Sequence, residues 1–102
     1  MDVDSHVLLA EIAWSRQQFE EAVEHYLAGS NISEDPALAE RTSLAAHQFN
    51  FNDIGLQAAN RWLSLSPTDI RAYQFLGIFE FRSGNLERTL ELFADLMNLD
   101  EN

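Results

Sequence analysis

The hydrophobic and polar positions from Tyr73 to Phe93, YQFLGIFEFRSGNLERTLELF, follow a helical pattern that contains two glycines. A glycine inside a helix costs roughly 0.5 to 1 kcal/mol relative to alanine, so each position needs a structural reason. Gly84 lies where a helix has to stop, and glycine readily adopts the left-handed conformation that closes a helix. Gly77 is expected to let a neighbouring helix approach closely. The stretch therefore predicts two helices rather than one.

The same arrangement of large and small residues occurs three times along the chain. Phe19, Asn52 and Leu86 are equivalent, at steps of 33 and then 34 residues (19 to 52 to 86). The large and small residues that recur in the same register are Leu9, Thr42 and Leu76; Ala10, Ser43 and Gly77; Ala22, Gly55 and Thr89; and Tyr26, Ala59 and Phe93. Antiparallel helices pack closely where facing side chains are small. The pattern predicts three helical hairpins, at about 3–35, 36–67 and 68–102.

Stop and start signals set the expected helix limits. Asp35 followed by Pro36 is typical of a helix N-cap and first turn, and the segment from Ser66 to Asp69 separates the second unit from the third. Asn52 and Asn85, or their neighbours, are expected to cap the second helices of their units. We predict helices at about 3–16, 19–30, 36–49, 52–65, 69–82 and 86–98. No long linker divides them, so we expect one all-α domain over residues 1–102.

The repeat resembles the tetratricopeptide repeat (TPR). The third unit has Tyr73, Leu76, Gly77, Gly84, Leu86, Thr89, Phe93 and Leu96 at the family's large and small positions, and the first has Leu9, Ala10, Phe19, Ala22 and Tyr26. The second unit departs from it, with Thr42, Asn52 and Ala59 where larger apolar residues are expected. The resemblance implies a TPR-type right-handed superhelix of three hairpins that binds a peptide or protein segment in its concave groove.

A narrower resemblance concerns the first unit and the passage DPALAER at residues 35–41. This part of the chain resembles the N-terminal repeats of proteobacterial outer-membrane TPR lipoproteins. That resemblance implies a periplasmic protein, tethered to the outer membrane in its full-length form, that acts as a protease adaptor. The chain has neither a signal peptide nor a cysteine for a lipid, so under this hypothesis it is an N-terminal segment. Otherwise, a cytoplasmic location is expected.

Charge narrows the class of partner. The chain carries 17 acidic residues and 6 arginines, has no lysine, and has a net charge of -11. Phosphate backbones and anionic lipid surfaces would repel it, so we expect no nucleic-acid partner. No apolar run approaches the length of about 18 residues that would indicate a membrane-spanning helix, so we expect no membrane insertion. The partner is expected to be another protein.

The sequence offers little catalytic chemistry. Glu21 and His25 are four residues apart and could share a helix face, but such a pair is usually part of a solvated surface. His47, near a helix end, is better explained by the helix dipole than by catalysis. There is no phosphate-binding glycine loop with its lysine. We therefore predict no enzyme activity, no catalytic residue, no metal site and no cofactor.

The first helices of TPR units line the concave groove, and the resemblance places a set of residues there. The aromatic residues from Tyr73 to Phe81 are divided between this groove and the core. The alternative is an unused concave face partly filled by a neighbouring helix. The predicted partner-binding residues are Val7, Glu11, Trp14, Glu40, Leu44, His47, Arg71, Gln74, Ile78, Phe81 and Arg82.

The final predicted helix leaves apolar residues without a following helix to cover them. Stacked repeats bury their apolar faces on their neighbours, and a terminal unit needs a polar outer face. Leu90, Phe93 and Met97 are therefore candidates for an oligomer interface. Either further repeats or a second copy in a symmetric contact would cover them. The alternative function is thus a structural self-association module of a larger scaffold, with this chain forming a homodimer or homo-oligomer.

Overall fold

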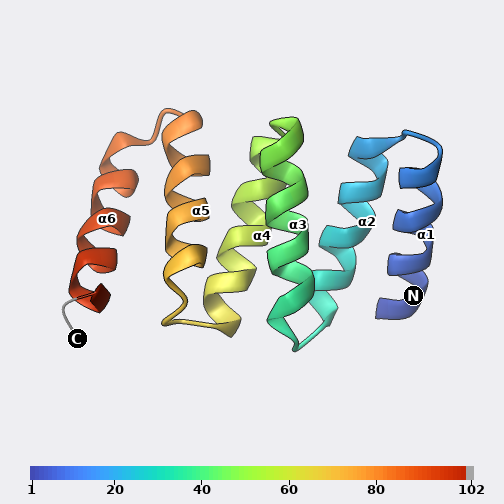
Figure 1. The fold of residues 1–102 in the computed structure, drawn as a ribbon, viewed down its shortest axis with the longest axis horizontal. Helices are drawn as coiled ribbons and strands as arrows, with labels where there is room; N and C mark the ends of the chain where they lie inside the picture. The colour runs from blue at the N-terminus through green and yellow to red at the C-terminus, as the bar shows by residue number, and fades with distance from the viewer. Residues whose placement is uncertain (101–102) are drawn as a thin grey trace.

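The computed structural model describes residues 1–100 of the protein, and all regular secondary structure in this range is α-helical. Figure 1 shows the helices side by side in a row. The molecule extends over 42 × 27 × 16 Å along its principal axes. Each hairpin packs on the next, and the chain folds as predicted into three of them. The helices are α1 (Val3–Ser15), α2 (Phe19–Ile32), α3 (Pro36–Phe49), α4 (Asn52–Leu65), α5 (Ile70–Arg82) and α6 (Leu86–Asp100).

The predicted helix limits are confirmed for α3 and α4 and shift by one or two residues elsewhere. Helix α1 ends at Ser15, one residue early, because Gln17 takes a positive φ of 60° in the turn. Helix α2 runs two residues further than predicted, to Ile32, with the Ser33 amide still donating to the Gly29 carbonyl at 2.9 Å. Helix α5 starts at Ile70, and α6 extends two residues beyond the predicted 98.

Aspartate side chains start three of the helices. Asp35 Oδ1 accepts from the Ala37 amide at 2.9 Å, with Pro36 in the first turn of α3, as predicted. Asp69 Oδ1 likewise accepts from the Arg71 amide at 3.0 Å, and Asp2 caps α1. These bonds satisfy amides that have no partner inside the helix.

The two asparagines proposed as caps behave differently. Asn85 accepts from the Arg88 amide at 3.2 Å and so caps α6 as predicted. Asn52 does not cap α4, because Phe51 occupies the N-cap position and makes no side-chain bond there. Asn52 is instead the first helical residue, and its Oδ1 is buried without a hydrogen-bond partner within residues 1–100.

The core is made of small residues that face a few large ones. Trp62 on α4 is 1% exposed and supplies bulk in the second unit, where the repeat has small residues. Its Nε1 donates to Asp69 Oδ2 at 3.1 Å, joining α4 to the start of α5. The central cluster consists of Val23, Ala45, Ala46, Ala59, Leu76, Phe79 and Leu92.

The glycines differ in how much space their neighbours leave. A Cβ atom added to Gly77 would meet only Phe93 Cζ, at 3.8 Å, so the predicted need for close approach at Gly77 is wrong. The tight position is Gly55, where a Cβ would lie 2.3 Å from the ring of Phe79. Gly84 has a φ of +84° and ends α5 as predicted.

Candidate functional site

The first helices of the first two hairpins stand apart. Helices α1 and α3 run in the same direction (Figure 1), and no Cα of α1 lies within 8 Å of a Cα of α3. Helices α3 and α5 do approach each other to that distance. The space between α1 and α3 forms two adjoining hollows, which together we call the α1–α3 groove.

The upper hollow of the α1–α3 groove has a volume of about 430 Å³. Tyr26 on α2 is 2% exposed and lies beneath the space between the two helices. Trp14 on α1 is held by edge contacts with Phe19 and Phe49, at ring-centroid distances of 5.0 and 5.6 Å. The upper hollow is therefore mainly aromatic and aliphatic with a polar rim. Its lining is Glu11, Trp14, Ser15, Tyr26, Arg41, Leu44, Ala45 and Gln48.

The lower hollow, of about 280 Å³, lies toward the N-terminal ends of the same helices. Its lining is Val3, Val7, Ser33, Asp35, Ala37, Leu38 and Arg41. Arg41 lines both hollows, with its guanidinium carbon 4.6 Å from the centre of the Tyr26 ring. It forms no ion pair with any described residue. The groove therefore presents an arginine held by an aromatic ring and without an acidic partner.

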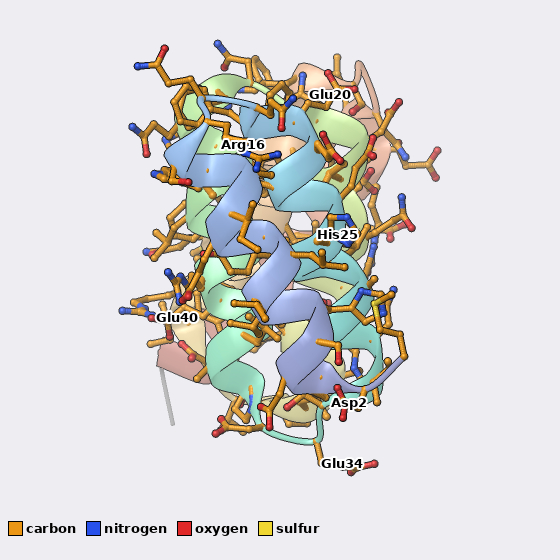
Figure 2. The ribbon with its side chains drawn as sticks, turned by 90° about the vertical axis from the view of Figure 1, so that its right-hand side faces the viewer. Asp2, Arg16, Glu20, His25, Glu34 and Glu40 are labelled. Carbon is orange, nitrogen blue, oxygen red and sulfur yellow. The ribbon has the colours of Figure 1, made fainter. Side chains whose placement is uncertain are left out.

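A second arginine, on α5, has a similar ring contact but a different charge environment. Arg71 lies 5.2 Å from the centre of the Trp62 ring and forms an ion pair with Glu40 of α3. The pKa of Arg71 is raised above its ordinary value because Glu40 accepts a hydrogen bond from it and adds a negative charge nearby. Figure 2, seen from the α1 end, places Glu40 on the α3 side and His25 on the opposite, α2 side. The charges of Arg71 and Glu40 are therefore paired within the molecule.

The predicted partner-binding residues fall into separate places. Glu11, Trp14 and Leu44 lie together in the upper hollow, and Val7 lies in the lower one. Glu40 and Arg71 pair between α3 and α5. The predicted residues outside both hollows are Glu40, His47, Arg71, Gln74, Ile78, Phe81 and Arg82.

The residues outside the hollows differ in exposure. His47 packs edge-on against Phe75 at a centroid distance of 5.5 Å, and its Nδ1 is buried without a hydrogen-bond partner among the described residues. Phe81 is 61% exposed on α5. Gln74 and Arg82 are exposed, and Ile78 is half-buried.

Five residues of the upper hollow were not among the predicted partner-binding residues. Tyr26 occupies a large position of the repeat, a pattern that does not distinguish packing from binding. Arg41 and Ala45 could have been found from the register, because they are equivalent to Phe75 and Phe79 (41 to 75 and 45 to 79). An alanine where the next unit has a phenylalanine indicates missing bulk. Nothing in the sequence pattern marks Gln48 or Ser15, which also line the upper hollow, as binding residues.

The groups considered for chemistry lie apart from this groove. His6 and His25 face each other across the α1–α2 hairpin, with ring centroids 5.8 Å apart. The described residues contain no group of three or more His, Cys, Asp or Glu side chains placed to hold a metal ion. Within residues 1–100, no helix is both long and apolar enough to span a bilayer.

The outer face of α6 is apolar. Leu86, Leu90, Phe93 and Met97 are 59, 69, 45 and 65% exposed, whereas Leu92 on the inner face is 1% exposed. Leu90, Phe93 and Met97 are the predicted oligomer-interface residues.

No family model matches the chain. A curated relative, TPR repeat-containing protein PA4667 of Pseudomonas aeruginosa, is 24% identical over 92 residues, which is 90% of this chain. The chain spans only 16% of that relative's length.

Several solved structures share the fold. A crystal structure of MamA has a TM-score of 0.71 at 16% identity over 98% of this chain and 59% of MamA. The first TPR domain of Spaghetti (RPAP3), bound to the HSP90 peptide SRMEEVD, has a TM-score of 0.68 at 17% identity over 99% of this chain and 81% of that one. The Sgt2 TPR domain from Aspergillus fumigatus has a TM-score of 0.67 at 16% identity, covering 98% of this chain and 67% of that one. The resemblance to TPR proteins and the predicted all-α, TPR-type superhelix of helical hairpins are confirmed.

Proposed function

We propose that the protein is a protein-binding module that holds a segment of its partner in the α1–α3 groove. The observation that carries this proposal is the upper hollow, about 430 Å³ of mostly apolar space over the buried Tyr26. Binding sites that anchor a partner usually combine an apolar pocket with a few placed polar groups. The RPAP3 domain, which shares the fold, holds a peptide.

The lining defines the chemistry of the segment. Trp14, Tyr26 and Leu44 would surround an apolar side chain, and burying it supplies most of the affinity. Arg41 stands between the two hollows without an ion-pair partner among the described residues. A carboxylate in the partner segment would bond to it, and charge-assisted hydrogen bonds of this kind are strong. We therefore infer a segment that carries an apolar anchor next to an acidic residue.

The test uses peptides selected from a displayed library against the wild-type chain. Calorimetry should show a loss of affinity of about tenfold or more in Ala45→Phe, because the new ring would occupy the upper hollow. Arg41→Gln should weaken only those peptides that carry the acidic residue. Circular dichroism would verify that both variants fold.

Gln57→Phe is the matched control, since it adds the same ring at an exposed position on α4. It should bind as wild type does. Peptides that bind Ala45→Phe and wild type equally well would contradict the proposed site.

The finer role of protease adaptor, and a periplasmic location, rest on the resemblance to outer-membrane TPR lipoproteins. An adaptor has to bring a second protein to the protease. We therefore expect the chain to increase cleavage of a substrate by a carboxy-terminal processing protease from the same organism, and Ala45→Phe to remove that increase. Equal cleavage with and without the chain would argue against the adaptor role and leave peptide binding untouched.

A further inference from the structure

The outward face of α6 is equivalent to faces that are covered inside the molecule. In the repeat register, Leu90, Phe93 and Met97 correspond to Val23, Tyr26 and Ser30 of α2. Those α2 residues are 0, 2 and 0% exposed, because α3 of the next hairpin packs against α2. The α6 residues are 69, 45 and 65% exposed. The open positions on α6 are therefore those that a following first helix would cover.

The outward face of α1 has the complementary property. Phe75 and Phe79 are the residues through which α5 packs on α4, with Phe75 against Trp62 and Phe79 over Gly55. Their equivalents on α1 are Leu8 and Ile12. Leu8 and Ile12 are 58 and 40% exposed.

The outward faces of α1 and α6 also carry opposite charges at one edge. In the internal contact between the first two hairpins, Phe49 of α3 stacks on Phe19 of α2 at a centroid distance of 4.5 Å. The equivalent of Phe49 is Arg16, at the C-cap of α1, and the equivalent of Phe19 on α6 is Leu86, next to Glu87. Figure 2 shows Arg16 on the α1 end of the molecule. Neither Arg16 nor Glu87 is in an ion pair with a described residue.

We propose that the occupant of the α6 face is the α1 face of a second copy of this chain. Leu8 and Ile12 of one copy pack between Leu90 and Phe93 of the other, as Phe75 and Phe79 pack on α4 within one copy. The contact joins two different surfaces, so it leaves a free α1 face at one end and a free α6 face at the other. Such head-to-tail contacts extend into rows unless the rotation closes a ring. This replaces the predicted symmetric contact and does not depend on the proposed groove function.

The experiment mixes two variants, each with one face disabled. Leu90→Glu changes the α6 face and Leu8→Glu the α1 face, and both positions are exposed, so the fold should be kept. By sedimentation, the wild type should rise to at least twice the monomer mass as its concentration approaches about 1 mM. Each variant alone should stay monomeric. An equimolar mixture should form a 1:1 dimer and nothing larger, because only one productive pair of faces remains.

Each of the other results would overturn the proposal. Association of Leu8→Glu alone would indicate a symmetric α6 contact, and a monomeric wild type at 1 mM would show that a second copy does not cover the face. Added salt should strengthen association, since screening the repulsion between copies with a net charge of -11 outweighs screening the single attraction between Arg16 and Glu87 at the edge. Weaker association in salt would contradict an apolar contact.

Leu44→Glu is the matched control, because it places the same charge on an exposed leucine in the α1–α3 groove. It should associate as wild type does while losing peptide binding. Failure of the head-to-tail association proposal can therefore be distinguished from failure of the peptide-binding proposal.

Discussion

The contact between the first and second hairpins and the contact between the second and third use the same positions but distribute bulk in opposite ways. In the first, the large residue is Tyr26 on α2, and α3 presents Ala45. In the second, α4 presents the small residues Gly55 and Ala59, and α5 fills the space with Phe79.

Which helix carries the bulky residue decides which of the two hairpin contacts is open. A ring projecting from the first helix, as in Phe79, occupies the space above the preceding second helix and closes it. A ring lying on the second helix, as in Tyr26, leaves that space open and becomes its floor. The two contacts also differ in charge, since Arg71 is paired with Glu40 whereas Arg41 has no ion-pair partner among the described residues. One repeat can thus be a packing unit or a binding unit.

The largest expected effect comes from removing the ring that closes the second contact. Phe79→Ala should lower the free energy of unfolding by about 3 to 5 kcal/mol, because a fully buried ring is lost and leaves a cavity. Urea denaturation measures this loss. Phe81→Ala, on the same helix but 61% exposed, should change stability by no more than about 0.5 kcal/mol. Similar losses in both variants would mean that Phe79 does not close the contact.

Adding one carbon at Gly55 should have the next largest effect. The Cβ of Gly55→Ala would lie 2.3 Å from the Phe79 ring, and overpacking of this kind costs about 1 to 3 kcal/mol. This loss of stability is larger than the gain expected from the higher helix propensity of alanine relative to glycine. In a double-mutant cycle, Phe79→Leu should relieve part of the cost and make the pair less destabilising than the sum. Additive losses would show that the two residues do not clash.

The aspartates that start α3 and α5 should differ in a smaller way. Asp69→Ala removes a helix cap and also leaves Trp62 Nε1 without its acceptor, whereas Asp35→Ala removes a cap alone. Asp69→Ala should therefore be more destabilising by about 1 kcal/mol. Thermal unfolding of the two variants gives the difference. Equal losses would indicate that the Trp62 bond contributes nothing to the second contact.

The smallest expected effect is local and depends on pH. Hydrogen bonds from the side chain and the backbone amide of Ser5 hold the pKa of Asp2 below its ordinary 3.8. A lowered pKa in the folded state stabilises α1 above pH 3.8, and that stabilisation is lost as the pH falls through the lowered value. Because α1 lacks close contact with α3, amide exchange should show α1 opening before α5 on acidification.

Asp2→Asn keeps a capping side chain but cannot titrate. It should remove the pH dependence of exchange in α1. If α1 and α5 opened together at every pH, the open contact between the first two hairpins would not lower the local stability of α1.

Much of the fold was predictable because it depends on local and periodic features. The spacing of large and small residues predicted three hairpins, and Asp35 with Pro36 and Gly84 marked helix ends that the structure confirms. The error concerns a side chain in three dimensions. Gly77 was expected to require close approach, but the clash lies at Gly55. Of Asn52 and its neighbours, which were the possible caps of α4, it is Phe51 that occupies the N-cap position.

The sequence by itself determined the helices, their pairing into hairpins and the acidic surface, since each follows from residues close together in the chain or from the overall composition. Only the tertiary structure decided where open space remains. A hollow such as that over Tyr26 depends on three helices at once, because it exists only where none of them supplies enough bulk. Ion pairing also depends on the tertiary structure, because Arg71 on α5 lies beside Glu40 on α3, whereas Arg41, between the two hollows, has no ion-pair partner among the described residues.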